Sequence, residues 1–130
     1  MASPATSTAP NRIAQIAVMV KDLPRAIRFY RDTLGLKFLF EAPPQMAFFD
    51  CGGVRLLIGL PEKPEFDHPA SIVYYHVADI AATVKTLRDK GVDVKQEPHF
   101  VAKLEKHDLW LAFIHDSEGN PVGLMSEVAR

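Results

Sequence analysis

Cysteine, net charge and long apolar runs are all scarce in this 130-residue sequence. A single cysteine, Cys51, excludes an intrachain disulfide framework and a cysteine-based zinc site, and it favours a reducing, cytoplasmic setting. The formal net charge of -1 is not the positive charge that is typical of proteins that bind nucleic acid or an anionic membrane. No apolar run approaches the roughly 20 residues of a membrane-spanning helix. The sequence therefore predicts a protein with neither nucleic acid nor membrane as a partner.

Apolar residues nevertheless make up 48% of the chain, which is enough for a globular core. Residues 1–11 are small or polar, and they lack the basic and apolar regions of a signal peptide. They predict a disordered tail. The remainder divides into a first module at 12–60, a proline-rich linker at 61–69 and a second module at 70–130.

The first module has the pattern of one strand, one helix and three further strands. A β-rich run at 13–20 precedes Asp22, which is placed to cap a helix that carries Pro24 in its first turn. Helical spacing of apolar residues continues to Gly35, where a helix end is expected. Three strand-like segments follow, at 36–41, 46–51 and 54–60.

The second module repeats this pattern at a distance of 57 positions, which aligns Val20 with Val77 and Asp22 with Asp79. Its expected strands lie at 71–77, 92–97, 109–115 and 122–127. The predicted fold class is α+β, with two tandem βαβββ modules that form a curved eight-stranded mixed sheet with a groove. If each helix covers one sheet face, the other face lines the groove. On the first strands, the groove face then carries Gln15, Ala17, Met19, Ile72, Tyr74 and His76.

Three runs of the sequence resemble the vicinal oxygen chelate superfamily, which includes glyoxalase I, bleomycin-resistance proteins and extradiol dioxygenases. The runs are VKDLPRAIRFYRDTLGL, VADIAATVKTLRDKGV and IHDSEGNPVGLM. The resemblance spans Ile13 to about Glu127 and implies a groove that is usually completed in a homodimer. It also implies that Leu111, Phe113 and His115 face the groove, with His107 near its mouth. Alternation along the last strand adds Met125 to the expected ligand-binding residues.

Metal-using members of this superfamily hold their ion with His or Gln on the first strand of each module and Glu on the last. By resemblance, those positions fall here on Gln15, Leu57, Ile72 and Gly123. Gln15 alone retains a ligand type, because a divalent ion requires oxygen or nitrogen donors at the other three positions as well. We therefore expect no metal cofactor, although divalent Zn, Ni, Mn or Fe with relocated ligands remains an alternative.

Five histidines are present, and His76, His107 and His115 are the candidates for general acid–base catalysis. The alternative is that they are ordinary wall residues, and His68 and His99 are expected to be solvated loop residues. The predicted function is the binding of a small organic ligand in an apolar groove, with or without a subsequent reaction. Two alternatives stay open: a metal-dependent lyase or dioxygenase whose ligands have moved onto these histidines, and a non-catalytic interaction module.

Overall fold

The computed structural model describes residues 8–130, so most of the predicted tail, residues 1–7, lies outside the described residues. Eight strands and two principal helices follow in chain order. Their bounds are β1 Gln15–Met19, α1 Leu23–Arg28, β2 Lys37–Ala42, β3 Met46–Cys51, β4 Val54–Gly59, β5 Val73–His76, α2 Ile80–Asp89, β6 Val94–Lys103, β7 His107–His115 and β8 Pro121–Ala129. A π-helical segment, Phe29–Thr33, continues α1, and a short 3-10 turn, Pro64–Phe66, lies in the linker.

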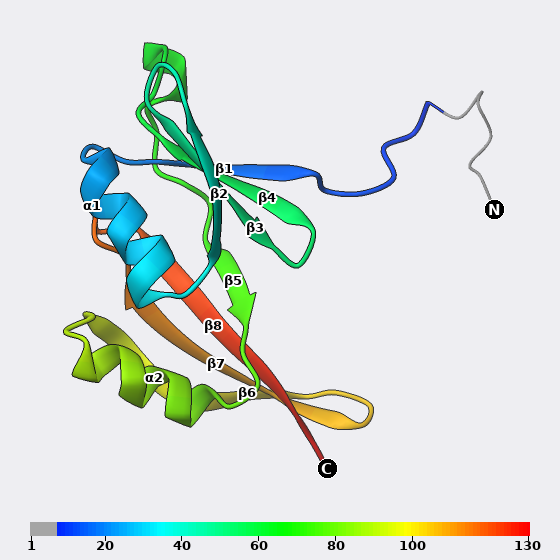
Figure 1. Ribbon diagram of the computed structural model, residues 1–130. Coiled ribbons are helices and arrows are strands. Elements are labelled where there is room, and N and C mark those ends of the chain that lie inside the picture. Colours follow the sequence, from blue (N-terminus) through cyan, green and yellow to red (C-terminus); the bar gives the residue numbers. More distant parts are fainter. Residues whose placement is uncertain (1–7) are drawn as a thin grey trace.

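The strands form two four-stranded sheets with the same internal order, β1-β4-β3-β2 and β5-β8-β7-β6. In each sheet the first and last strands of the module pair in parallel, and the other pairs are antiparallel. The identical order confirms the predicted duplication and the two βαβββ modules. The eight strands are thus shared between two open sheets, with both helices on one side of the molecule (Figure 1).

Both helices begin at the aspartates that the sequence predicts. Asp22 Oδ1 accepts a hydrogen bond from the backbone N–H of Arg25 at 3.1 Å, and Asp79 Oδ1 accepts one from Ala82 at 3.0 Å. Each contact satisfies a backbone donor that the first helical turn leaves without an intrahelical partner. No helix within residues 8–130 is long and apolar enough to cross a membrane.

Strand β6 is longer than the sequence predicts, because it continues through Pro98 to Lys103. Proline lacks the backbone N–H needed in the middle of a sheet, which is why the predicted strand stops at Glu97. In the structure β6 is the edge strand, and its register with β7 shifts between Gln96 and His99. An edge position with a register shift accommodates the missing donor.

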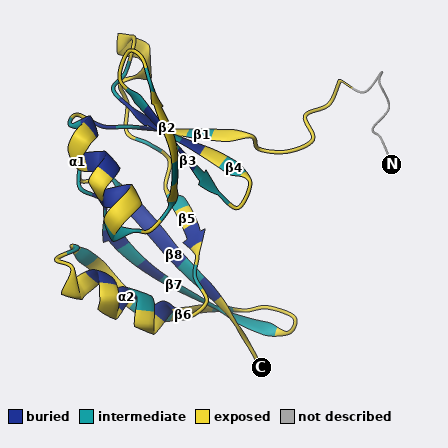
Figure 2. Cartoon of the chain, in the orientation of Figure 1, coloured by how far each residue is buried: buried dark blue, intermediate teal, exposed yellow. Residues whose placement is uncertain are grey.

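The inner faces of both sheets and both helices bury one hydrophobic cluster that includes residues from each module. Figure 2 shows buried stretches along the strands and alternating buried and exposed stretches on each helix. The largest fully buried side chains are Tyr30, Phe49, Ile58, Ile114, Leu124 and Val84. The opposite sheet faces receive no helix and remain partly exposed.

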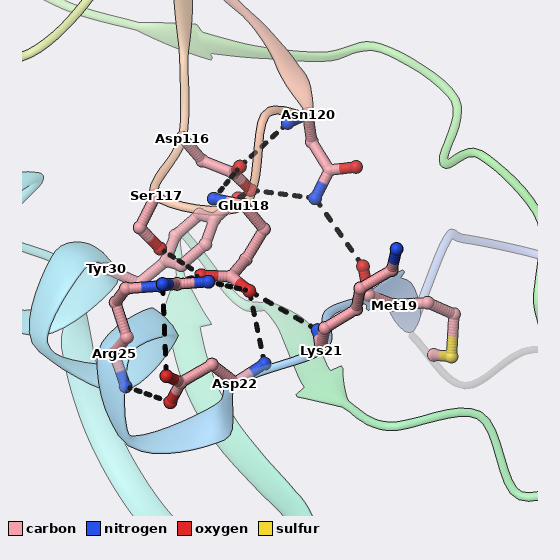
Figure 3. A network of polar contacts seen from close by, with 9 residues as sticks. All are labelled: Met19, Lys21, Asp22, Arg25, Tyr30, Asp116, Ser117, Glu118 and Asn120. Carbon is pink, nitrogen blue, oxygen red and sulfur yellow. Dashed lines mark hydrogen bonds and ion pairs between the residues drawn. The ribbon is translucent and has the colours of Figure 1, made fainter.

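A polar network joins the modules where the turn between β7 and β8 meets α1 and its π-helical continuation (Figure 3). Asp116, which is 6% exposed, accepts a hydrogen bond from the hydroxyl of Tyr30 at 2.7 Å. It also accepts from the backbone N–H groups of Glu118 and Asn120, each at 2.8 Å. The Asp116 carboxylate therefore orders its own turn and attaches that turn to the first module. Each of these hydrogen bonds offsets the cost of burying the carboxylate.

Glu118 provides the second part of this network. Its carboxylate accepts from Arg25 Nε at 2.7 Å and Nη2 at 3.1 Å, and from the backbone N–H of Asp22 at 3.1 Å. The Arg25 hydrogen bond lowers the pKa of Glu118 to about 2, although burial of the carboxylate opposes this shift. The ionised form of Glu118 is consequently the form that the folded protein stabilises.

We expect this pKa shift to make stability dependent on pH. The folded pKa of Glu118 lies below its ordinary value of 4.5, so its stabilising contribution is complete above that value and is lost as pH falls towards 2. Glu118→Gln should lower the free energy of unfolding by roughly 1–2 kcal/mol at neutral pH, since Arg25 is half exposed and solvent screens the pair. Chemical denaturation at pH 7, 4 and 2.5 measures this difference.

Glu105→Gln is the matched control, because Glu105 is exposed and forms no ion pair within residues 8–130. The control should differ from wild type by less than about 0.5 kcal/mol at every pH. A Glu118→Gln effect that stays constant down to pH 2.5 would contradict the assignment.

Candidate functional site

The open face of the first sheet carries three rows of side chains, because paired strand residues point to the same side. The strand register places these rows as follows: a polar row of Gln15, Arg55, Asp50 and Lys37; an apolar row of Ala17, Leu57, Phe48 and Phe40; and a second apolar row of Met19, Gly59, Met46 and Ala42. The rings of Phe40 and Phe48 stack with their centroids 4.8 Å apart. Polarity thus changes from one end of this face to the other.

An apolar hollow of about 290 Å³ lies on this face. Its floor comes from Ala17, Met19, Met46 and Leu57, and its wall from Leu60, Glu62, Phe66 and His68. The floor belongs to β1, β3 and β4, whereas the wall belongs to Leu60, directly after β4, and to the linker with its 3-10 turn. The segment that the sequence identifies as a linker therefore also encloses space above the first sheet.

His68 is exposed, as expected for a loop residue, but it lines this hollow, a role that the sequence analysis missed. Its Nδ1 lies 3.0 Å from the carbonyl oxygen of Pro69. A carbonyl oxygen only accepts, so this hydrogen bond places the proton on Nδ1 and leaves the lone pair of Nε2 available. No motif marks His68 in the sequence, because its position depends on the path of the linker.

A second hollow of about 470 Å³ shares Met19, Leu60 and His68 with the apolar hollow. Its remaining lining is largely polar: Val20, Lys21, Arg25, Pro61, Asp67, Pro69, Glu118 and Asn120. We call it the polar hollow. Arg25 and Glu118 pair with each other there, so part of its charge is already neutralised within the protein.

The open face of the second sheet is mainly aromatic and apolar. Tyr74 pairs with Gly123 on β8, and Gly123 pairs with Phe113 on β7. The rings of Tyr74 and Phe113 meet edge to face, with centroids 5.8 Å apart. The next row contains His76, Met125 and Leu111. Tyr74 and the preceding Ile72 are exposed.

The structure does not bring the three candidate catalytic histidines together. His107 and His115 stand at opposite ends of β7, roughly 26 Å apart along an extended strand. His76 lies on β5, across Met125 from the middle of β7. His115 Nδ1 lies 3.8 Å from Asp93 Oδ2, an oriented but half-exposed pair. Within one chain these three residues cannot act on the same ligand atom.

The four positions that correspond to metal ligands do not fit a divalent ion. Gln15 Oε1 already accepts a hydrogen bond from Arg55 Nε at 2.9 Å, and Leu57 and Ile72 have no donor atom. A Cβ atom at Gly123 would lie 2.5 Å from Cδ2 of Tyr74, so the ring occupies the space that a glutamate side chain needs. Within residues 8–130 no cluster of three or more His, Cys, Asp or Glu side chains could hold a metal.

These positions divide between the sheets. Gln15 and Leu57 lie on the first, Gly123 lies on the second, and Ile72 directly precedes β5. The repeat places each of the four at an equivalent strand position, and we therefore expect them to come together in the assembled protein.

Paired βαβββ modules, each with an open sheet face, define the architectural class of this protein. The chain belongs to the Glyoxalase/Bleomycin resistance protein/Dioxygenase superfamily, whose model matches residues 12–124. This confirms the family that the sequence resembles.

Two solved structures share the fold. Lactoylglutathione lyase from Agrobacterium tumefaciens is 23% identical, with a TM-score of 0.71 over 90% of this chain and 94% of that one. A superfamily member from Sphaerobacter thermophilus DSM 20745 is 21% identical, with a TM-score of 0.75 over 91% and 98%. An uncharacterized protein of Bacillus subtilis (strain 168), YraH, is 28% identical over 102 residues, which cover 68% of this chain and 79% of YraH.

We expect protein purified without chelator to carry far less than one equivalent of zinc, nickel, manganese or iron, because one amide oxygen is a weak ligand. Gln15→Ala should leave the metal content unchanged and alter the free energy of unfolding by less than about 0.5 kcal/mol, as for other exposed substitutions. Plasma mass spectrometry and chemical denaturation measure the two quantities. Near-stoichiometric metal that is lost when Gln15 and one histidine are both replaced would contradict this expectation.

Proposed function

We propose that this protein binds a small organic molecule with a flat apolar body in the apolar hollow, without a divalent metal. The observation that carries the proposal is the composition of the hollow. Its floor is apolar, its wall is closed by Phe66 and Leu60, and its polar groups are limited to Glu62 and His68. Ligand sites typically combine such an apolar lining with a few placed polar groups, and about 290 Å³ lies close to the lower end of their range of size.

Binding is favoured over a defined reaction because the chemistry-bearing groups are dispersed. Glu62 and His68 are the titratable groups that line the hollow in the described part of the chain. Any acid–base step in one chain would therefore use Glu62 or His68, since His76, His107 and His115 stand on the other sheet. Those three histidines reach the ligand only if the second sheet of another copy covers the hollow.

We further propose that two copies associate through their open sheet faces, in the cytoplasm, where Cys51 stays reduced. Phe40, Ile72 and Tyr74 are each about half exposed on or beside these faces, and association would remove these large apolar side chains from water. Light scattering at micromolar concentration should therefore give the mass of a homodimer. A sharp monomeric mass would contradict the association and would confine the ligand site to one chain.

The binding site can be tested with the fluorescent neutral probe phenylnaphthylamine. Leu57→Glu should weaken probe binding at least tenfold, because it replaces an apolar side chain on the floor of the hollow with a carboxylate. The matched control is Leu104→Glu, the same change at an exposed position after β6. Fluorescence titration should give the control the affinity of wild type within twofold. Equal losses in both variants, or no binding to wild type, would refute the site.

A further inference from the structure

We infer that Arg55 binds the anionic group of the ligand, and that the ligand is an aromatic carboxylate. The inference rests on the proposed function, because it assumes that the apolar body of the ligand occupies the apolar hollow. It adds a charged anchor beside the hollow at one of the sheet rows where the resemblance places metal ligands. The fixed positive charge in that row is then the guanidinium of Arg55, where the metal-using members have a metal ion.

Two contacts orient the Arg55 side chain. Its Nε donates to Gln15 Oε1 at 2.9 Å, a contact set by the register that places Arg55 directly opposite Gln15 on β1. Its Cζ lies 5.7 Å from the centroid of the Phe48 ring, within the range of a cation–π interaction. The guanidinium has five N–H donors, and the four on its Nη atoms have no acceptor within residues 8–130.

Within residues 8–130 Arg55 forms no ion pair. Asp50 lies directly across from it on β3, and Lys37 lies across from Asp50 on β2. In the described part of the chain neither cation forms an ion pair with Asp50 within 4.0 Å. The polar row thus holds two cations and one anion, and a carboxylate ligand would balance it.

The position of Arg55 relative to the hollow determines the shape of ligand that fits. Arg55 is two residues from Leu57 on the same strand and the same face, so their Cα atoms are roughly 6–7 Å apart. Phe48 lies directly across from Leu57, and its ring stacks on Phe40. A flat body held over Leu57 in the apolar hollow therefore brings a carboxylate at its edge towards the Nη atoms, where a bidentate contact can form.

Arg55 is also unfavourable to a metal ion beside Gln15. The side-chain oxygen of Gln15, the remaining donor of the set, is already bound by a cation. The positive charge of the guanidinium repels a divalent ion. The same permanent charge keeps the anchor competent for a carboxylate.

Lys21 is the alternative cation that could bind the ligand carboxylate, because it lies in the polar hollow on the other side of Met19.

The test uses naphthoate and the isosteric neutral naphthamide as competitors that displace phenylnaphthylamine. On wild type, naphthoate should bind about tenfold more tightly than naphthamide, as expected for one charge-assisted contact. Arg55→Met should abolish this preference and leave naphthamide affinity unchanged. Lys21→Met should retain the preference.

Asp50→Asn provides a second measurement that does not remove the anchor. It should strengthen naphthoate binding and leave naphthamide binding unchanged, because it removes a negative charge beside Arg55. Equal affinity of the two competitors for wild type, or a preference lost in Lys21→Met and kept in Arg55→Met, would overturn the inference while leaving the hollow intact. Failure of phenylnaphthylamine to bind wild type would instead refute the proposed function itself.

Discussion

The buried carboxylate of Asp116 is the interaction on which the arrangement of the two modules depends. It accepts one hydrogen bond from the Tyr30 hydroxyl of the first module and three from donors of its own turn, including Asn120 Nδ2 at 2.9 Å. A carboxylate at 6% exposure is tolerated because these donors satisfy it. The strong local bonding of the turn means that the second module presents a rigid edge to α1, instead of a loop that must be ordered on contact.

This contact also reaches the candidate site. Asn120 Nδ2 donates to the carbonyl oxygen of Met19 at 3.5 Å, and Met19 is the last residue of β1. Met19 lines both hollows, while Glu118 and Asn120 line the polar one. Two residues of the junction therefore line the polar hollow, and one of them contacts Met19, which lines both hollows.

Most of the fold could be predicted from the sequence, because local signals such as the capping Asp22 and Asp79 and the alternation of β3 act over a few residues. Strand β6 was predicted too short, since the edge position that accommodates Pro98 is a property of the sheet. The candidate site was harder to predict from the sequence for the same reason. Gln15 and Arg55 are 40 residues apart, and only strand register makes them neighbours. His68 depends on a linker path that no periodicity describes.

The ring of Tyr74 over Gly123 shows how the duplicated halves have diverged. The equivalent pair in the first module is Ala17 beside Leu57, so the two modules place their large side chain on opposite members of the same strand pair. Over Ala17 the space stays open and the linker encloses it, whereas over Gly123 the aromatic ring fills it. The two halves of the repeat therefore differ: the first sheet carries a hollow beside the linker, whereas an aromatic ring covers the equivalent position of the second. Each face can therefore accumulate substitutions under a different selective pressure.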